Sequence, residues 1–372
     1  MSDVKKIETL LSRYVEKIYP SLEALKETLV SGRKLVFYLG IDPTGPDIHI
    51  GHSTNLLWLK KFQELENKVI LLIGDFTARV GDPDKESVRK ALSTQEVEQN
   101  MKTYLAQAKK ILPEKSFEVR YNSQWLAKLT LEEIIKLASH FTVQQMIVRD
   151  MFQERLNKEK PIYLHEFFYP LMQGYDSVAM EVDGEIGGDD QTFNMLIGRD
   201  LMKDILKKDK FVVTTKLLED SKTGKKIMNK SEGNVISLND SPQEIRRKVL
   251  SLDDGLVKTV FELCTEKEQD WIDENEKGDP RAFKEALAGE LVQMYYGQSA
   301  VAEAQKPIEV LVVDLPLPQA LKVWGIVSTI SAGRDLINNG GVQINGESTD
   351  WNYKPKAGDE IKIGKGKFFK VI

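Results

Sequence analysis

The chain has 372 residues, which is enough for two or three domains that each bury a core of their own. Hydrophobic residues make up 41% and charged residues 29%, without any low-complexity tract, which excludes fibrous and intrinsically disordered proteins. The formal net charge of −5 argues against a general nucleic-acid binder.

No apolar window reaches the ~18 residues that a membrane-spanning helix needs, and the N-terminus lacks the apolar core of a secretory signal. The single cysteine, Cys264, excludes an internal disulfide and a multi-cysteine zinc site. We therefore expect a cytoplasmic protein that has no contact with a membrane.

Residues 5–31 predict one or two surface helices, and the apolar run Lys34–Ile41 predicts a buried strand. Two prolines and a glycine in Asp42–Pro46 then predict a tight turn, after which His49–His52 opens a helix. Unpaired N–H groups and the helix dipole attract anions there, and histidines three residues apart share one helical face. This arrangement predicts a phosphate-handling site; the alternative is a capped helix with two incidental histidines.

A second apolar run, Lys68–Gly74, predicts another strand, so that two strands enclose one helix. Such a βαβ unit requires a parallel sheet, and ligands of these sheets lie beyond the carboxyl ends of the strands. The loops after Ile41 and Gly74 both fall at that edge. Residues 87–140 are mostly helical in pattern, with one further strand predicted at Phe117–Tyr121.

Two apolar stretches follow. Phe141–Arg155 has apolar residues at helical spacing, which predicts either a core helix or a surface stripe for a dimer contact. Leu164–Met180 is apolar and aromatic, but it carries Tyr169, Gln173 and Asp176 on one helical face. Because unpaired buried polar groups are costly, either an internal hydrogen-bond network or a ligand must satisfy these three side chains.

The turn Gly187–Gln191 (GGDDQ) places glycines beside acids and an amide, which predicts a second pocket-like loop. Residues 209–218 predict another strand, and the basic, glycine-punctuated loop Lys222–Asn234 follows it. Residues 241–305 are helical in pattern, and a proline-containing linker then leads to a small compact tail. Lysines crowd the end of that tail, which predicts a local contact with a polyanion.

His49-Ile50-Gly51-His52 matches the HIGH motif of the class I aminoacyl-tRNA synthetases residue for residue. Together with Tyr38, Asp42 and Thr44 in front of it, the stretch resembles the bacterial-type tyrosyl-tRNA synthetases. No other catalytic arrangement, such as a Ser-His-Asp set or a metal-ligand cluster, is apparent in the sequence.

The loop Lys226–Ser231 resembles the second class I motif, KMSKS. Ile227 stands where the first lysine of that motif is usual, and Lys225 and Lys226 are the two candidates to replace it. Lys230 can place a mobile ammonium on a triphosphate and offset charge as diphosphate departs.

The resemblance covers nearly the entire chain and implies an α/β fold. The implied parts are a Rossmann-like parallel-sheet catalytic domain at 1–240 with a helical dimerisation insertion at about 87–165, an α-helical anticodon-side domain at 241–306, and a small α+β RNA-binding domain at 313–372. Because this family inserts its dimerisation segment here, we favour the dimer contact for the apolar stripe in 141–155.

The resemblance also implies the residues of the site. L-tyrosine would be bound by Tyr38, Asp42, Asp82, Tyr169, Gln173, Asp176 and Gln191. ATP would be bound by His49, Gly51, His52, Asp190, Met228, Lys230 and Ser231. The groups acting on the phosphates and nucleotide in catalysis would be Thr44, His49, His52 and Lys230. Tyr38 and Asp176 would meet the phenol hydroxyl, and Mg²⁺ would accompany the triphosphate.

The tail resembles the small S-four-type RNA-binding module through 332–347 and 354–372. By this resemblance, the RNA backbone would meet Arg334, Lys354, Lys356 and Lys365. Binding of this kind recognises shape and phosphate, so it should weaken as salt rises. The alternative is a solvated lysine-rich face.

The implied reaction is activation of L-tyrosine by ATP, followed by transfer to the 3′ end of tRNA(Tyr), in a homodimer. Two alternatives remain. One is a tryptophan-specific synthetase of the same fold, and the other is a catalytically idle RNA-binding paralogue, which the isoleucine at position 227 motivates.

Overall fold

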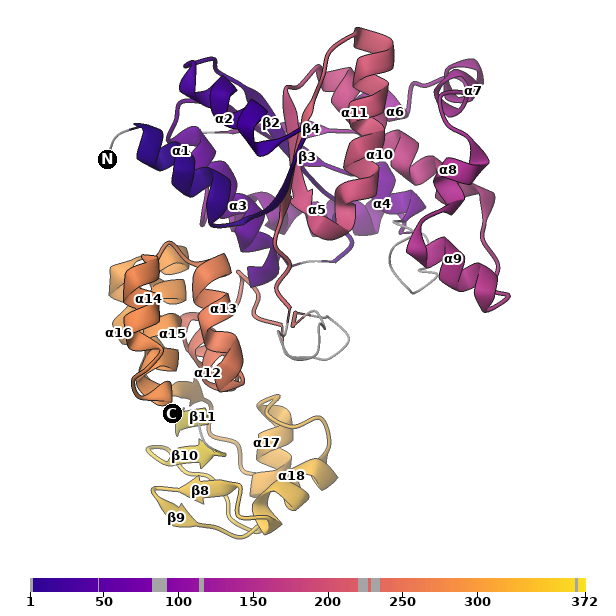
Figure 1. Cartoon of the computed structure of the whole chain (residues 1–372). Helices are drawn as coiled ribbons and strands as arrows, with labels where there is room; N and C mark the ends of the chain where they lie inside the picture. Colours follow the sequence, from indigo (N-terminus) through magenta and orange to yellow (C-terminus); the bar gives the residue numbers. More distant parts are fainter. Residues whose placement is uncertain are drawn as a thin grey trace. The chain divides into compact units, whose positions relative to one another are not determined.

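The computed structural model describes residues 3–45, 47–81, 92–113, 117–219, 227–228, 235–364 and 367–372 (Figure 1). The chain divides into two compact units. The first consists of residues 1–233, 237–239 and 259–266, and the second of residues 234–236, 240–258 and 267–372. Each unit contains its own clusters of buried apolar side chains.

A six-stranded sheet in the order β1-β6-β5-β2-β3-β4 forms the centre of the first unit. Its strands are β1 (Val15–Tyr19), β2 (Val36–Ile41), β3 (Lys68–Ile73), β4 (Phe117–Tyr121), β5 (Gly184–Gly188) and β6 (Phe211–Thr215). β1 pairs with β6 antiparallel, and the other five strands are mutually parallel. β2 and β3 are mostly buried because their side chains are apolar on both faces. The predicted α/β fold with a parallel sheet is confirmed.

The first unit also contains helices, most of which flank this sheet (Figure 1). They are α1 (Asp3–Ser12), α2 (Leu22–Val30), α3 (Ile50–Gln63), α4 (Thr77–Val80), α5 (Thr94–Ala108), α6 (Ser123–Leu126), α7 (Leu131–Ala138), α8 (Val143–Ile147), α9 (Asp150–Asn157), α10 (Phe168–Met180) and α11 (Thr192–Leu206), with 3₁₀ turns η1 (Leu164–Phe167) and η2 (Asp189–Gln191). α3 packs on β2 through Trp58 and Phe62, whose rings lie 5.4 and 4.7 Å from that of Phe37.

The order of the strands locates the switch point of the sheet. From β2 the chain continues to β3 and β4 on one side, whereas β5 pairs with the opposite edge of β2 and leads to β6. Ligands of open α/β sheets bind beyond the carboxyl ends of the strands at such a point. The loops that follow Ile41, Ile73 and Gly188 all begin at that edge.

Two of the predicted elements were wrong in part. Residues 5–31 contain strand β1 between two helices, because Val15–Tyr19 pairs with a strand almost two hundred residues later. Phe141–Arg155 is not one helix: α8 and α9 are separated at Val148 and Arg149. Within the predicted stripe, Met146 and Phe152 are buried, whereas Val148 is 63% exposed.

The second unit begins with a group of helices, and α13 also contributes residues to the first unit. These helices are α12 (Pro242–Leu250), α13 (Asp254–Cys264), α14 (Gln269–Asn275), α15 (Pro280–Tyr296) and α16 (Gln298–Ala304). Ser241 and Asp279 cap α12 and α15, and each is followed by a proline whose fixed φ suits the first helical turn.

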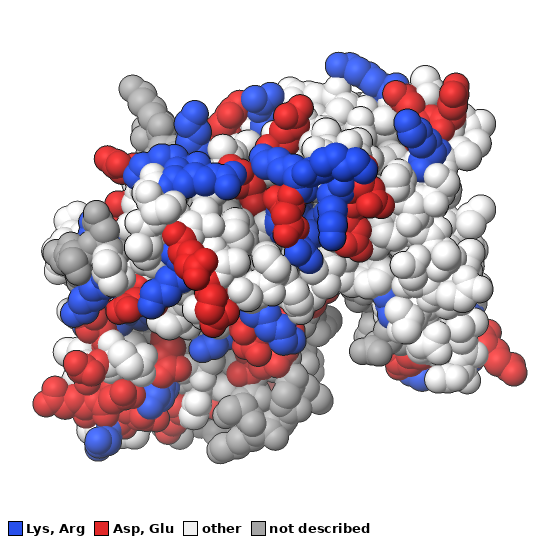
Figure 2. Space-filling view, turned by 45° about the horizontal axis from the view of Figure 1, so that its top comes forward, with Lys and Arg blue, Asp and Glu red and all other residues white. Residues whose placement is uncertain are grey.

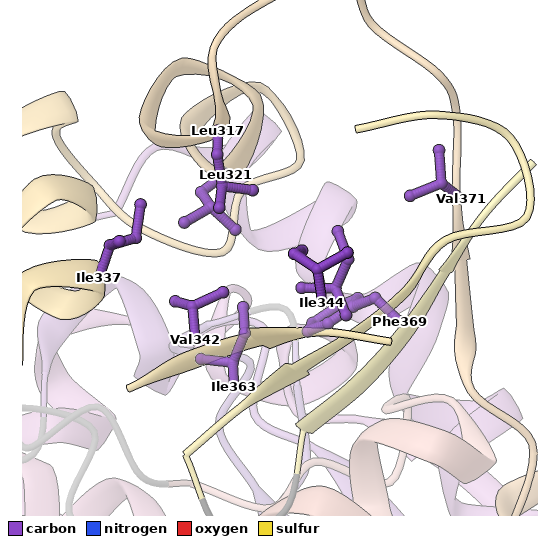
Figure 3. Packing of buried hydrophobic residues seen from close by; sticks show 9 residues of the cluster. Leu317, Leu321, Ile337, Val342, Ile344, Ile363, Phe369 and Val371 are labelled. Atoms are coloured by element: carbon purple, nitrogen blue, oxygen red, sulfur yellow. The ribbon is translucent and has the colours of Figure 1, made fainter. Parts of the chain in front are cut away.

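A five-stranded sheet and two helices complete the second unit. They are β7 (Ile308–Val310), β8 (Val342–Ile344), β9 (Glu347–Ser348), β10 (Glu360–Ile363), β11 (Lys367–Val371), α17 (Leu317–Val323) and α18 (Ile330–Asn338). Side chains of both helices and of the sheet meet in one core, which includes Leu321, Ile337 and Ile363 (Figure 3). Gly333 lets the helices approach, since an added Cβ would lie 3.1 Å from Pro318 Cα.

Figure 2 shows basic and acidic side chains intermixed over much of one face, whereas the middle of its right-hand side, on the side where α7–α9 lie in Figure 1, is mostly uncharged. The exposed apolar side chains of this region are Leu131, Ile135, Val143, Val148, Leu156, Tyr163 and Leu164. Across the part of the chain that the structure describes, no helix is both long and apolar enough to span a bilayer.

Candidate active site

The turn after β2 holds Asp42 at the carboxyl edge of the sheet. Thr77 Oγ1 donates to Asp42 Oδ1 at 2.7 Å, and Tyr169 Oη donates to Asp42 Oδ2 at 2.8 Å. A Cβ added to Gly74 would lie 1.9 Å from Asp42 Oδ1, so the carboxylate occupies space that only glycine leaves open. Both carboxylate oxygens are therefore fixed by side chains from α4 and α10.

His49 and His52 lie together at the start of α3. His49 is the N-cap residue, with φ −112° and ψ 169°, and its Nδ1 accepts a hydrogen bond from the Gly51 N–H at 3.2 Å. His52 Nδ1 lies 3.4 Å from the His49 N–H, and the two ring centroids are 4.1 Å apart. Because Nδ1 of His49 accepts, its neutral imidazole carries hydrogen on Nε2, which is therefore a donor.

The segment that follows the KMSKS-like loop returns to this turn. Ser237 forms an isolated β-bridge with His49, and the Leu238 N–H donates to Ile48 O at 2.9 Å. Met228, predicted for ATP, has a buried side chain. Four further lysine and serine positions of the motif lie outside the described residues: Lys225, Lys226, Lys230 and Ser231.

Asp176 of α10 is 2% exposed and accepts two hydrogen bonds. Trp125 Nε1 donates to its Oδ1 at 2.6 Å, and Asn122 Nδ2 donates to its Oδ2 at 3.2 Å. Asn122 Nδ2 also donates to Thr77 Oγ1 at 3.0 Å, and Thr77 in turn holds Asp42. One continuous hydrogen-bonded chain thus connects the buried carboxylate to the carboxylate at the edge of the sheet.

A second polar group is buried around Tyr38. Lys210 Nζ donates to Glu185 Oε2 at 2.5 Å and to Ser177 Oγ at 2.8 Å, with the lysine and glutamate side chains 0% and 2% exposed. Tyr38 Oη lies 2.9 Å from Ser177 Oγ. Gln173 Nε2 donates to Glu185 Oε1 at 3.0 Å. These side chains come from β2, α10, β5 and the residue directly before β6.

Burial dominates the titration of these side chains. It raises the pKa of the Asp176 carboxyl well above its usual range, although two hydrogen bonds to that carboxyl act in the opposite direction. Burial, followed by the Glu185 and Asp176 carboxylates, raises the pKa of the Tyr38 hydroxyl, which therefore stays neutral at physiological pH. Burial lowers the pKa of Lys210, and the adjacent Glu185 carboxylate opposes that shift.

The loop after β5 places Asp190 and Gln191 just before α11. Asp190 is exposed, and a Cβ added to Gly188 would lie 2.6 Å from its Oδ1. Gln191 Oε1 accepts from Asn194 Nδ2 at 3.1 Å. The second glycine-containing loop therefore starts at the same carboxyl edge as Asp42.

The structure thus brings five residues predicted for tyrosine into two hydrogen-bond networks: Tyr38, Asp42, Tyr169, Gln173 and Asp176. Protein groups already satisfy the polar face of α10, so the internal-network alternative is present in the folded chain. Asp82, predicted for the same ligand, lies outside the described residues. Among the described residues, no cluster of three or more His, Cys, Asp or Glu side chains could hold a metal ion.

The residues predicted for RNA lie in the compact tail. Arg334, Lys354 and Lys356 are exposed. The Arg334 guanidinium lies 5.0 Å from the Trp351 ring centroid, and Lys354 Nζ pairs with Asp314 at 2.8 Å. Lys365 lies outside the described residues.

Sequence reasoning did not single out several side chains of the two networks: Thr77, Asn122, Trp125, Ser177, Glu185 and Lys210. One signal was available, because Asn122 directly follows a predicted strand and so had to lie at the ligand edge. Glu185 and Lys210 carried a weaker signal, namely a charge inside or next to an apolar strand, which requires a partner when buried.

Comparison with known families and structures agrees with this architecture. The family described as tRNA synthetases class I (W and Y) matches residues 30–312, and the S4 domain matches residues 315–361. A mitochondrial tyrosyl-tRNA synthetase of Coccidioides posadasii superposes with a TM-score of 0.66 at 24% identity, over 82% of this chain and 91% of that one. Tyrosyl-tRNA synthetase of Archaeoglobus fulgidus gives 0.63 at 19% identity, over 82% and 99%. Because these sequence identities are below 25%, the two superpositions establish the fold of the chain and nothing further.

Full-length relatives are closer in sequence. Tyrosine–tRNA ligase of Carboxydothermus hydrogenoformans is 40% identical and spans 100% of this chain and 99% of its own length. That of Haemophilus influenzae is 38% identical, with coverage of 100% and 98%. The resemblance first indicated by the HIGH motif is thereby confirmed along the whole chain. The chain therefore belongs to the class I aminoacyl-tRNA synthetases, and within them to the tyrosine–tRNA ligases.

Proposed function

We propose that the chain activates L-tyrosine with ATP to tyrosyl-adenylate and diphosphate, and then transfers tyrosyl to the 3′ end of tRNA(Tyr). Class I synthetases use ATP. The observation that supports the choice of amino acid is that the Tyr38 hydroxyl and the Asp176 carboxyl are both buried, with electrostatic influence of Asp176 on Tyr38, beside the apolar side chains of Ile70, Leu72 and Val182. A ligand hydroxyl can add a hydrogen bond to these two side chains beyond their protein partners, and an analogue without the hydroxyl cannot.

Tyr38 and Asp176 bind the phenol hydroxyl of the substrate. Asp176 accepts a hydrogen bond from it, while Trp125 and Asn122 keep the carboxylate oriented. At the other end of α10, the substrate α-ammonium meets Tyr169 and Gln173 together with Asp42, Asp82 and Gln191. Tyr169 already donates to Asp42 and so leaves that carboxylate anchored as the ammonium arrives.

The phosphates of ATP lie over the start of α3. His49 uses Nδ1 to cap the helix, so Nε2 donates to a phosphate oxygen, and Thr44 donates beside it. His52 and Gly51 support the nucleotide, and Asp190 accepts from the ribose hydroxyls. We expect Met228, Lys230 and Ser231 of the KMSKS-like loop to contact ATP. Ser237, which follows that loop in the chain, forms a β-bridge with His49. Positioning and electrostatic stabilisation then assist the attack of the tyrosine carboxylate on the α-phosphorus.

Mg²⁺ would accompany the triphosphate, held mainly by phosphate oxygens, and would offset negative charge on the phosphates. Lys230, assisted by Lys225 or Lys226 in place of the usual first lysine, adds mobile positive charge at the same phosphates.

The C-terminal part binds tRNA. We assign residues 1–240 to catalysis, 241–306 to the anticodon-side helical domain and 313–372 to the RNA-binding domain, with a cytoplasmic location for the whole. Arg334, Lys354, Lys356 and Lys365 contact the RNA backbone, so Lys354→Ala with Lys356→Ala should weaken tRNA binding and flatten its salt dependence.

The insertion at about 87–165 forms a homodimer. Its exposed apolar side chains support this proposal, since Leu131, Ile135, Val143 and Val148 are 73%, 61%, 68% and 63% exposed. Placing lysines at Ile135 and Val148 together should convert a dimer to a monomer in sedimentation velocity, whereas an unchanged dimer would contradict the proposed surface.

The deciding experiment is ATP–diphosphate exchange with tyrosine, tryptophan and phenylalanine as alternative substrates. We expect exchange with tyrosine far above the other two. Exchange with tryptophan alone would support the tryptophan-specific alternative, and no exchange with any of the three would support the idle paralogue.

A further inference from the structure

We infer that Lys210 is a positioning residue for tyrosine recognition: it fixes the hydrogen-bond directions of Tyr38 through Ser177 and of Gln173 through Glu185. This inference rests on the proposed function, since it assigns tyrosine to the site that these two side chains border. A single ammonium thereby sets both ends of the amino-acid site.

The Lys210 side chain is fully enclosed by the described residues. Its Nζ lies 2.8 Å from Ser177 Oγ and 2.5 Å from Glu185 Oε2, and its side chain is 0% exposed. A Cβ added to Gly198 would lie 2.6 Å from that Nζ. The ammonium therefore occupies a space that α11 leaves open through the absence of a side chain at one position.

The first branch runs to Gln173. A carboxylate only accepts hydrogen bonds, and Glu185 Oε1 lies 3.0 Å from Gln173 Nε2. The amide must therefore turn its NH₂ toward Glu185 and its carbonyl oxygen away, where it is an acceptor for an ammonium. Lys210 Nζ holds the other carboxylate oxygen of Glu185 at 2.5 Å, so this orientation persists.

The second branch runs to Tyr38. An ammonium has donors only, so Ser177 Oγ must accept from Lys210. The Ser177 proton is then available to Tyr38 Oη, 2.9 Å away. The Tyr38 hydroxyl therefore keeps its own proton for an acceptor other than Ser177, either the Glu185 carboxylate or a substrate hydroxyl. Lys210 does not contact the ligand in this arrangement. It acts through Ser177 on the hydrogen-bond direction of Tyr38, which faces the phenol hydroxyl of the substrate.

The buried Lys210–Glu185 ion pair is not explained by a contribution to stability alone. Replacing a buried ion pair by neutral side chains of similar volume is commonly neutral or stabilising, so stability does not require these charges. The orientation of the two substrate-facing side chains does require them.

The test is Glu185→Gln combined with Lys210→Met, which removes both charges without leaving one unpaired. We expect the unfolding temperature to stay within about 4 °C of the wild type. The KM for tyrosine in ATP–diphosphate exchange should rise about 10-fold through lost preorganisation of two hydrogen bonds, while the KM for ATP stays within about twofold. A folded double variant with an unchanged KM for tyrosine would overturn the inference.

Ser177→Ala tests the phenol branch separately and keeps the inference falsifiable if the double variant fails to fold. We expect the preference for tyrosine over phenylalanine to fall about 10-fold, whereas an unchanged preference would overturn the assignment of this branch. Lys208→Met is the matched control, because that lysine is partly exposed and pairs with Asp183 at 3.3 Å. If the wild type itself shows no tyrosine-dependent exchange, the proposed function fails, an outcome distinct from those of the variants.

Discussion

The two ends of the candidate site hold their polar groups in different ways. At the inner end, Asp176 and Tyr38 are buried and locked by side-chain partners from distant elements. At the phosphate end, His49 and His52 are partly exposed and are held mainly by the backbone of their own helical turn. The first arrangement suits discrimination of a small neutral group, and the second suits a charged ligand that must be released.

The largest effect should come from Asp176→Asn. We expect kcat/KM for tyrosine to fall about 10³-fold, because a buried charged acceptor is worth about 4 kcal/mol to a hydroxyl. The unfolding temperature should not fall, since burial opposes the carboxylate charge. Steady-state ATP–diphosphate exchange measures kcat/KM, and calorimetry measures the unfolding temperature. If Asp176→Asn loses activity only because it unfolds, Asp176 does not serve to discriminate the substrate hydroxyl.

His49→Ala should lower kcat about 10²-fold and leave the KM for tyrosine nearly unchanged, because the imidazole acts on the phosphates. The substitution also removes a helix N-cap, at a cost of about 1 kcal/mol in stability. His49→Asn is the matched control, since asparagine restores the cap without the imidazole. If His49→Asn recovers kcat as well as stability, the histidine is structural.

Gly74→Ala should displace the Asp42 carboxylate, because the new Cβ would lie 1.9 Å from Oδ1. We expect the KM for tyrosine to rise about 10-fold and stability to fall by about 1–3 kcal/mol. Gly255→Ala in α13 is the control, since no atom lies within 4 Å of its added Cβ. If Gly74→Ala and Gly255→Ala change the KM for tyrosine equally, Asp42 does not contribute to tyrosine binding.

The smallest effect concerns pH. Burial raises the folded-state pKa of Asp176, so the folded protein binds more protons than the unfolded chain above the ordinary carboxyl pKa of about 4. Stability that is present below this value is therefore lost as pH rises toward the raised pKa. The free energy of unfolding of wild type and Asp176→Asn can be measured with urea from about pH 4, the ordinary carboxyl pKa, upward. The variant should become more stable relative to the wild type as pH rises. A constant difference would contradict the direction of the shift.

Local patterns in the sequence predicted the parallel sheet and the HIGH turn, because both depend on short runs and turn residues. The polar face of α10 was also predictable from spacing alone. Strand β1 was not, since five residues of mixed polarity become a strand only through pairing with β6. Likewise, the roles of Glu185 and Lys210 depend on a contact between a side chain of β5 and one directly before β6, and no local pattern specifies which charges will meet.

The adjacency of β2 and β5 has a consequence for synthesis of the chain. During translation, Val36–Ile41 pairs early with β3, but its other edge has no partner until Gly184–Gly188 emerges. The nascent chain therefore keeps an open strand edge at the centre of its sheet for more than a hundred residues. Gln191, a proposed tyrosine contact, follows β5 in the chain, so the complete tyrosine site exists only after this strand is made, and tyrosine should favour the completed sheet over shorter intermediates.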